Sequence, residues 1–185
     1  MRITDLPEHF IIGQQVRLLA PDVSHCRDIY TLISGFTEVH YEFLLWLNVK
    51  CSIETCYKNL EIASDNFIRD KDEYRFLIVD TQLNYLVGCI SLYIKNPKIP
   101  FYEIGYWVSS QSMGKGFVTE ACTLVKDIAC DYLRCERLEI KMASRNVRSA
   151  KVALRTGFQL EARLKKHRLD GFGHIDDTCI YSYPI

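Results

Sequence analysis

The stretch Gln111-Ser112-Met113-Gly114-Lys115-Gly116 lies between a strand-like run, residues 102–108, and a helix-like run, residues 117–132. Its two glycines let the backbone approach a ligand closely and adopt dihedral angles that a Cβ atom disfavours. The first N–H groups of the following helix have no partner inside that helix, and the helix dipole adds positive potential there. A turn of this kind is typical of a pyrophosphate site. The alternative is an ordinary tight turn that begins an amphipathic helix.

The loop fits the pattern Gln111-x-x-Gly114-x-Gly116, and two further motifs flank it: Glu103-Ile104-Gly105-Tyr106-Trp107-Val108 before it, and Asn146-x-x-Ser149 with Gly157-Phe158 after it. The motifs resemble the GNAT superfamily of N-acyltransferases. Within that superfamily they resemble the RimJ/RimL branch of ribosomal-protein N-alpha-acetyltransferases and its polyamine- and drug-modifying relatives. By element order the resemblance covers nearly the whole chain, whereas by motif it covers residues 102–183.

The composition is that of one globular domain. A chain of 185 residues buries roughly 70% of its unfolded surface on folding, and no linker, repeat or low-complexity segment divides this one, so we expect a single domain over residues 1–185. Its 23 basic and 23 acidic residues balance, which argues against a nucleic acid or an anionic membrane as a partner. We find no signal peptide and no run near the roughly 20 apolar residues of a membrane span, and therefore expect a cytoplasmic protein.

The eight cysteines, at positions 26, 51, 56, 89, 122, 130, 135 and 179, do not indicate a metal site. No Cys-x-x-Cys motif occurs, and no histidine stands at zinc-finger spacing except the adjacent pair His25-Cys26. Most of the cysteines fall on apolar faces of predicted elements. We expect them to be small core residues, with no metal bound and no acyl-enzyme formed.

Hydrophobic periodicity and turn residues predict a mixed α/β (α+β) chain. Asp22, Ser52 and Asn146 are predicted helix N-caps. Residues 36–50 are more apolar than a loop requires, which fits either a second core helical turn or, by resemblance, a wall of the acceptor pocket. The strands are expected at residues 14–20, 74–80, 85–95, 102–108, 137–143, 158–164 and 175–183, and the helices at 22–35, 52–73, 117–132 and 146–157.

The resemblance implies a GNAT-like acyl-CoA N-acyltransferase fold. Its central sheet is mostly antiparallel, contains one parallel pair of strands that splay apart, and is flanked by helices. Acetyl-CoA would be the co-substrate, held by backbone amides of residues 111–116, with its pantetheine arm between the splayed strands. A backbone N–H near Trp107 or Val108 would polarise the thioester carbonyl. The implied cofactor-binding residues are Trp107, Val108, Gln111, Met113, Gly114, Lys115, Gly116, Asn146 and Ser149.

Two residues compete for the role of general base. In some branches of the superfamily a glutamate at the position of Glu103 takes the proton, which requires burial to raise its pKa. Alternatively, Glu103 is a surface residue without a catalytic role, on a strand in which polar and apolar residues alternate. His167 stands at the position that often carries a glutamate base in the RimL-type pattern, and histidine titrates near neutral pH. Alternatively, His167 has no catalytic role and belongs to a solvated basic hairpin tip, residues 165–168, before the turn Asp170-Gly171.

The general acid departs from the usual superfamily pattern. Many members place a tyrosine seven residues after the asparagine of the third motif, where this chain has Ala153. The RimJ/RimL branch is expected to use Ser149 instead, with Asn146 bonding the pantetheine or a structural water. Without that role, Asn146 is an N-cap and Ser149 a routine first-turn residue.

The function implied by the resemblance is acetyl-CoA-dependent N-acetyl transfer to a primary amine, by direct attack in a ternary complex. A protein N-terminus is the first choice of acceptor, and a polyamine or an aminoglycoside is the rival. The basic run 165–168 argues against a polycation, whereas Asp176 and Asp177 argue for one. Two other interpretations stay open, a catalytically inactive acyl-CoA-binding protein and an unrelated nucleotide-binding domain. A homodimer is also open, because dimers are common in the family.

Overall fold

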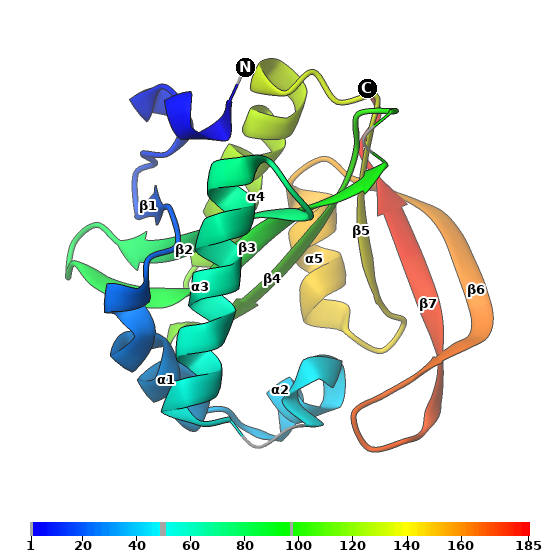
Figure 1. Cartoon of the computed structure of the whole chain (residues 1–185). Helices are drawn as coiled ribbons and strands as arrows, with labels where there is room; N and C mark the ends of the chain where they lie inside the picture. The colour runs from blue at the N-terminus through cyan, green and yellow to red at the C-terminus, as the bar shows by residue number, and fades with distance from the viewer. Residues whose placement is uncertain (1, 49–50, 97) are drawn as a thin grey trace.

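The computed structural model describes residues 2–48, 51–96 and 98–185, and its centre is one seven-stranded sheet (Figure 1). The strand order is β1-β2-β3-β4-β5-β7-β6. Neighbouring strands are antiparallel except β4 and β5, which are parallel. This confirms the mixed α/β architecture. The strands are β1 Val16–Leu19, β2 Glu73–Asp80, β3 Tyr85–Asn96, β4 Phe101–Val108, β5 Arg137–Ala143, β6 Gln159–Leu169 and β7 Ile175–Ser182.

The helices begin where the sequence supplies an N-cap. The side chains of Asp22, Ser52 and Asn146 each accept a hydrogen bond from a backbone N–H of the following turn, as predicted. The α-helices are α1 Cys26–Ser34, α2 Glu38–Phe43, α3 Ile53–Arg69, α4 Phe117–Asp127 and α5 Val147–Arg155. Short 3₁₀ turns occur at Ile3–Asp5, Glu8–Phe10, Val23–His25, Leu45–Asn48 and Ser110–Ser112, and a π turn, Ile128–Tyr132, follows α4.

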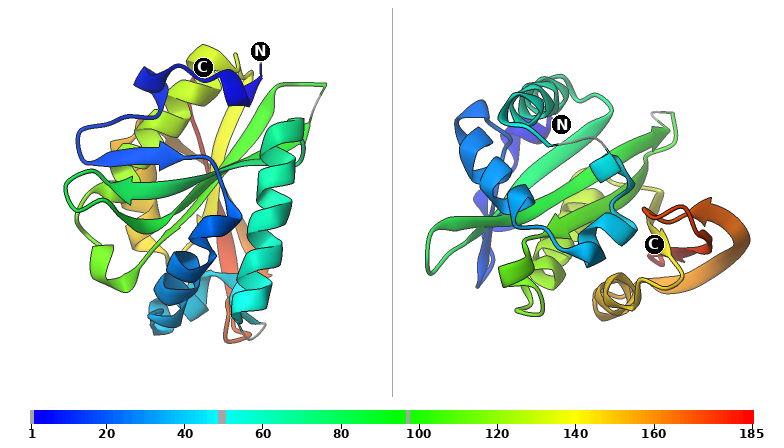
Figure 2. Two further views of the ribbon diagram at one scale, coloured as in Figure 1. Left: turned by 60° about the vertical axis from the view of Figure 1, so that its left-hand side comes forward. Right: turned by 90° about the horizontal axis from the view of Figure 1, so that it is seen from below.

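Helices cover both faces of the sheet, α1 and α3 on one side and α4 and α5 on the other (Figure 2). On one face, Leu77 and Val79 of β2 pack in a cluster with residues of α1 and α3. On the other face, Phe76 and Ile78 pack in a cluster with residues of α4 and with Phe67 near the end of α3. This alternation along one strand follows the pleat. Six of the eight cysteines are buried and all are free thiols, in agreement with their prediction as core residues.

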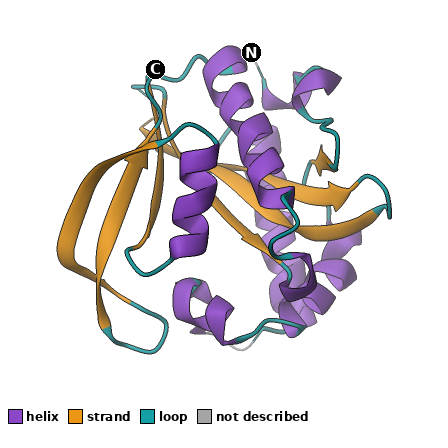
Figure 3. Cartoon of the chain, turned by 180° about the vertical axis from the view of Figure 1, so that it is seen from behind, coloured by secondary structure: helices purple, strands orange, loops and turns teal. Residues whose placement is uncertain are grey.

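The parallel pair β4 and β5 separates soon after it begins. Phe101, Tyr102 and Glu103 pair with Arg137, Leu138 and Glu139. From Glu139 onward β5 pairs with β7, while β4 continues alone on this side. Seen from behind, α5 stands between the three C-terminal strands and the rest of the sheet (Figure 3). The splayed pair that the resemblance implied is therefore present.

Two predicted boundaries are wrong. The helix from Ser52 ends at Arg69, where Asp70 adopts a left-handed conformation, so Glu73 belongs to β2. Strand β6 continues to Leu169, so residues 165–168 lie in the strand and not at a hairpin tip. The pairing of β6 with β7 shifts register between Leu164 and Arg168. A bulge of this kind lets a strand continue through a sequence that does not alternate.

We predict that Phe76→Ala lowers the free energy of unfolding by about 3–5 kcal/mol, because it empties a fully buried aromatic site. The Phe76 side chain is 1% exposed, and its ring meets that of Phe67 edge to face at 5.2 Å. Urea denaturation measures the loss. The matched control is Leu83→Ala, at a turn position that is 67% exposed. A loss at position 76 no larger than at position 83 would contradict this account of the core.

Candidate functional site

The loop between β4 and α4 holds two glycines in left-handed conformations. Gly114 has φ +76°, and Gly116, the N-cap of α4, has φ +93°. Residues that carry a Cβ atom adopt such angles only at a cost, so this backbone favours glycine at both positions. No atom lies within 4 Å of the position that a Cβ of Gly114 would take. The backbone of the loop is therefore accessible to a ligand, next to the N-terminus of α4.

A cavity of about 440 Å³ opens beside this loop. We call it the basic cavity, because its wall contains Arg148, Lys151 and Arg155 of α5. None of the described residues that line it is an aspartate or a glutamate. Three cations and the positive end of α4 favour an anionic ligand here. No motif in the sequence points to these three residues, although their spacing places them on one face of a helix.

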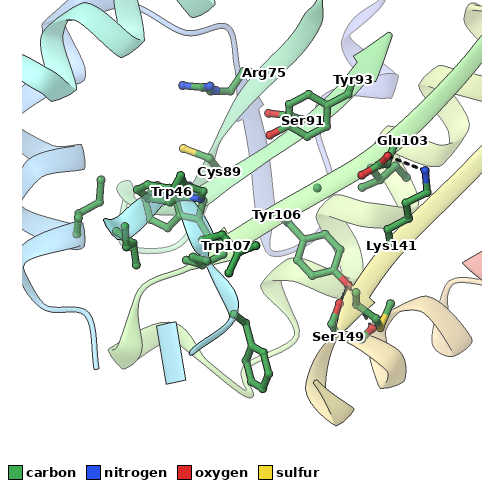
Figure 4. Close-up of a pocket in the computed structure, with 18 of the residues that line it drawn as sticks. Trp46, Arg75, Cys89, Ser91, Tyr93, Glu103, Tyr106, Trp107, Lys141 and Ser149 are labelled. Atoms are coloured by element: carbon green, nitrogen blue, oxygen red, sulfur yellow. Dashed lines mark hydrogen bonds and ion pairs between the residues drawn. The ribbon is translucent and has the colours of Figure 1, made fainter. Parts of the chain in front are cut away.

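A second cavity, of about 740 Å³, is lined by residues of β2, β3, β4 and β5 (Figure 4). We call it the aromatic cavity. One wall comes from residues 36–50, which contribute Phe43, Leu44, Trp46 and Leu47. The rings of Trp46 and Trp107 are 6.4 Å apart. This segment is thus both helical and a cavity wall, as far as Asn48; positions 49 and 50 lie outside the described residues.

The floor of the aromatic cavity is the sheet, whose side chains follow the strand register. Cross-strand partners face the same side of a sheet, and alternate rows face the same way. Gly105 leaves room for the ring of Tyr93, since a Cβ at position 105 would stand 2.8 Å from Tyr93 Cε2. The rows across β2, β3 and β4 are Glu73, Tyr93 and Glu103, then Arg75, Ser91 and Gly105, then Leu77, Cys89 and Trp107.

The two cavities meet at the gap between β4 and α5. Tyr106 of β4 and Ser149 of α5 line both, and their hydroxyl oxygens are 2.8 Å apart. The Tyr106 hydroxyl also donates to the Ser149 carbonyl at 3.2 Å. Burial raises the pKa of Tyr106, so its phenol stays protonated at neutral pH and can donate a proton. Six residues line both cavities: Phe43, Leu44, Tyr106, Trp107, Asn146 and Ser149.

His40 fixes the end of β4 next to this junction. The Thr37 N–H donates to His40 Nδ1 at 3.1 Å, so in the neutral ring the proton is on Nε2. Nε2 then donates to the Val108 carbonyl at 2.9 Å. The ring of His40 is buried and stacks on Phe36 with centroids 4.0 Å apart. Helix α2 is therefore bound to the strand residue from which the glycine loop departs.

The structure brings together most, but not all, of the predicted site residues. Trp107, Val108, Met113, Gly114, Gly116, Asn146 and Ser149 line the basic cavity, whereas Gln111 and Lys115 are exposed and do not line it. Asn146 Oδ1 accepts from the Ser149 N–H at 3.1 Å, which confirms the N-cap. Tyr106 was not among the predicted site residues, because only the fold brings its hydroxyl group to that of Ser149.

The two predicted bases lie in different places. Glu103 lines the aromatic cavity, where its carboxylate is 3.2 Å from Lys95 Nζ and 3.4 Å from Lys141 Nζ. His167 is exposed on β6, and its Nδ1 is 3.0 Å from the Thr178 hydroxyl. His167 does not line either cavity. The role of each residue stays a prediction.

Within residues 2–48, 51–96 and 98–185, no three histidine, cysteine, aspartate or glutamate side chains are grouped as metal ligands would be. In the same part of the chain, no helix combines the length and the apolar character needed to cross a bilayer.

Comparison with known proteins identifies a family and several relatives, one of which matches nearly the whole chain. Residues 16–159 match the family described as the acetyltransferase (GNAT) domain. The ribosomal-protein-serine acetyltransferase of Escherichia coli (strain K12) is 26% identical over 180 residues, which cover 97% of this chain and 98% of that protein. The probable N-acetyltransferase YjcK of Bacillus subtilis (strain 168) is 34% identical over 97 residues, which cover 52% of this chain and about half (54%) of that protein.

A solved structure shows the same fold. The microcin C7 self immunity acetyltransferase MccE, in complex with acetyl-CoA and AMP, superposes with a TM-score of 0.85. Its sequence is 25% identical, and the superposition covers 94% of each chain.

We predict that Asn146→Ala lowers the free energy of unfolding by about 1 kcal/mol, whereas Asn146→Asp has little effect. A carboxylate can still accept from the Ser149 N–H and suits the positive end of α5. Thermal denaturation of both variants measures the difference. Equal losses in the two variants would mean that the capping hydrogen bond does not stabilise α5.

Proposed function

The chain belongs to the acetyltransferase (GNAT) family and is an acyltransferase, and from this premise we propose that it transfers the acetyl group of acetyl-CoA to a primary amine. The donor occupies the basic cavity and the acceptor the aromatic cavity. The observation that carries the proposal is their junction, because six residues line both and a hydrogen-bonded pair of hydroxyl groups stands there. Reactants held on the two sides of such a junction can react directly.

The donor site matches the chemistry of coenzyme A. Its pyrophosphate needs backbone N–H groups and positive charge, which the glycine loop and Arg148, Lys151 and Arg155 supply. The related MccE structure holds acetyl-CoA, which supports the same ligand here. The acetyl thioester then extends along β4 toward Tyr106 and Ser149.

Direct attack is favoured over an acyl-enzyme. Cys51, Cys56 and Cys89 line the aromatic cavity. Burial raises the pKa of the Cys56 and Cys89 thiols to about 12, so that both are protonated near neutrality and are poor nucleophiles. The Cys51 sulfur lies 3.4 Å from that of Cys56. The neutral amine of the acceptor is the better nucleophile.

Residues that line the two cavities can supply the proton that the leaving group needs and accept the proton that the amine loses. The amine nitrogen attacks the thioester carbonyl carbon, and the C–S bond then breaks. The leaving thiolate takes a proton from the Ser149 and Tyr106 pair, whose phenol replaces the one absent at Ala153. The proton lost by the amine passes, through water, to a carboxylate. Glu103 suits this role better than His167, because Glu103 lines the acceptor side.

A protein N-terminus is the first acceptor class, supported by the relative that acetylates a ribosomal-protein serine. Leu45 and Trp46 are exposed, line the aromatic cavity and offer contact area to a peptide. The argument for a polycation weakens, because Asp176 and Asp177 are already paired with Arg145 and Arg163. A cytoplasmic location and a homodimer stay predictions.

Mass spectrometry of an amine panel tests the function. The protein and acetyl-CoA would be incubated with N-terminal peptides, spermidine and an aminoglycoside, and each would be examined for an added acetyl group. Acetylated peptide is the expected product. Acetylated spermidine without acetylated peptide would show that the acceptor is a polyamine and not a protein N-terminus. Tight acetyl-CoA binding with no acetylated amine would favour a non-catalytic acyl-CoA-binding protein.

We predict that Gly114→Val weakens acetyl-CoA binding at least about 10-fold, which corresponds to about 1.4 kcal/mol. The branched side chain strains the left-handed backbone and stands where the donor approaches. Calorimetry measures the affinity. Gly173→Val is the matched control, since Gly173 has φ +85° with open space around it, but lies in the β6–β7 loop. Unchanged binding in the Gly114 variant would exclude the glycine loop as the donor site.

We predict that Ser149→Ala and Tyr106→Phe each lower kcat by about 100-fold, the usual scale for a general acid, while acetyl-CoA affinity changes little. Because the two hydroxyl groups form one hydrogen-bonded unit, the double variant should be no slower than the worse single variant. Steady-state kinetics with a peptide acceptor measure all three. Multiplying losses in the double variant would show that the two residues act separately.

A further inference from the structure

The charges of the aromatic cavity are arranged with cations outward and carboxylates buried. Arg75 Nη2 lies 2.6 Å from Glu73 Oε1, and the side chains are 25% and 9% exposed. Lys141 Nζ lies 2.6 Å from Glu139 Oε1, and the side chains are 34% and 2% exposed. In each pair the cation is the more exposed partner, and Arg75 and Lys141 line the cavity whereas Glu73 and Glu139 do not. A ligand in the cavity therefore meets the positive member of each pair.

Arg168 adds a third cation that has spare hydrogen-bonding capacity. Its side chain reaches the aromatic cavity from β6, and it is the one member of the basic run 165–168 that lines this cavity. Its Nε is buried and has no hydrogen-bond partner among the described residues. A buried guanidinium N–H without a partner is unfavourable, and a ligand oxygen would satisfy it.

The acidic residues near Arg168 are engaged elsewhere. Its cross-strand partner is Asp176 of β7. The Asp176 carboxylate instead accepts from the Ser144 hydroxyl at 2.8 Å and from Arg145 Nε at 3.1 Å. Asp170 likewise bonds Arg145 and the backbone N–H groups of its own loop. Arg168 is thus left to face the cavity, where Glu103 is the one acidic lining residue among those described.

We propose that the acceptor amine carries a carboxylate, which Arg168 binds within the aromatic cavity. This inference rests on the proposed function, because it takes the aromatic cavity as the acceptor site. The forked guanidinium matches a carboxylate or phosphate in geometry as well as in charge. Trp46, Trp107 and Phe43 contact the apolar body of the acceptor, while Arg75 and Lys141 add positive potential. A polyamine is disfavoured by the same charges.

Two sources share this chemistry and need separate experiments. One is a protein N-terminus with an acidic side chain within its first few residues. The other is a small amine that bears its own carboxylate. Peptides that begin Ser-Phe-Asp-Glu or Ser-Phe-Asn-Gln represent the first, with otherwise identical sequences. Phenylalanine and its amide represent the second, since they differ only in the negative charge.

Calorimetry measures binding of these four probes to the CoA-saturated protein, and turnover with acetyl-CoA is measured in parallel. In at least one pair, the acidic probe should bind about 10- to 100-fold more tightly than its amide, the size of a charged hydrogen bond. Arg168→Gln should abolish this preference, and Arg168→Lys should restore part of it. Lys165→Gln removes one positive charge from the same strand outside the cavity and should leave the preference intact.

Three results would overturn the proposal: equal binding of the acidic and amide probes, a preference that survives Arg168→Gln, or a preference lost equally in Lys165→Gln. Absence of binding by both acidic probes would also overturn it. Turnover decides the proposed function separately. Acid-selective binding without acetylation of any amine would contradict the acetyltransfer, but would leave the anion site in place.

Discussion

The short pairing of β4 with β5 is the constraint on which the site depends. The two strands share three residue pairs and then part at Glu103 and Glu139. Past this point β5 pairs with β7, and one edge of β4 is left without a neighbouring strand in the described sheet. Backbone polar groups that lack a strand partner can bind a ligand or solvent instead. Tyr106 crosses the resulting gap to Ser149, and the two cavities meet there.

The two cavities achieve positive potential in different ways, and each suits its proposed ligand. In the basic cavity the cations stand on one helix, α5, without an acidic lining residue among those described, as suits a ligand with several phosphates. In the aromatic cavity Arg75 and Lys141 are balanced by carboxylates buried beneath them. That balance avoids a strongly charged pocket, which would raise the cost of binding a body that is mainly apolar. A positive cavity also favours the neutral form of an amine, the form that attacks.

Local patterns in the sequence predicted local structure well. The caps at Asp22 and Ser52 and the glycine loop depend on neighbours in the chain, and they are where the pattern placed them. The Tyr106 and Ser149 pair could not be predicted in this way, because the two residues are 43 positions apart and meet only when β4 and α5 pack. The basic run 165–168, next to the turn Asp170-Gly171, is typical of a solvated hairpin tip, and this pattern gives no sign that Arg168 lines a cavity. A register shift in β6 keeps that run in the strand and brings Arg168 to the cavity.

The central claim, that the glycine loop and α5 form an acetyl-CoA site, is tested most directly by the melting temperature of the protein with and without this ligand. ATP and NAD serve as controls, because they also carry phosphates. A ligand at about 100 times its dissociation constant adds about 2.7 kcal/mol to the free energy of unfolding, enough to raise the melting temperature by several degrees. This account predicts such a rise with acetyl-CoA and none with ATP or NAD. No rise at millimolar acetyl-CoA, or an equal rise with ATP, would contradict it.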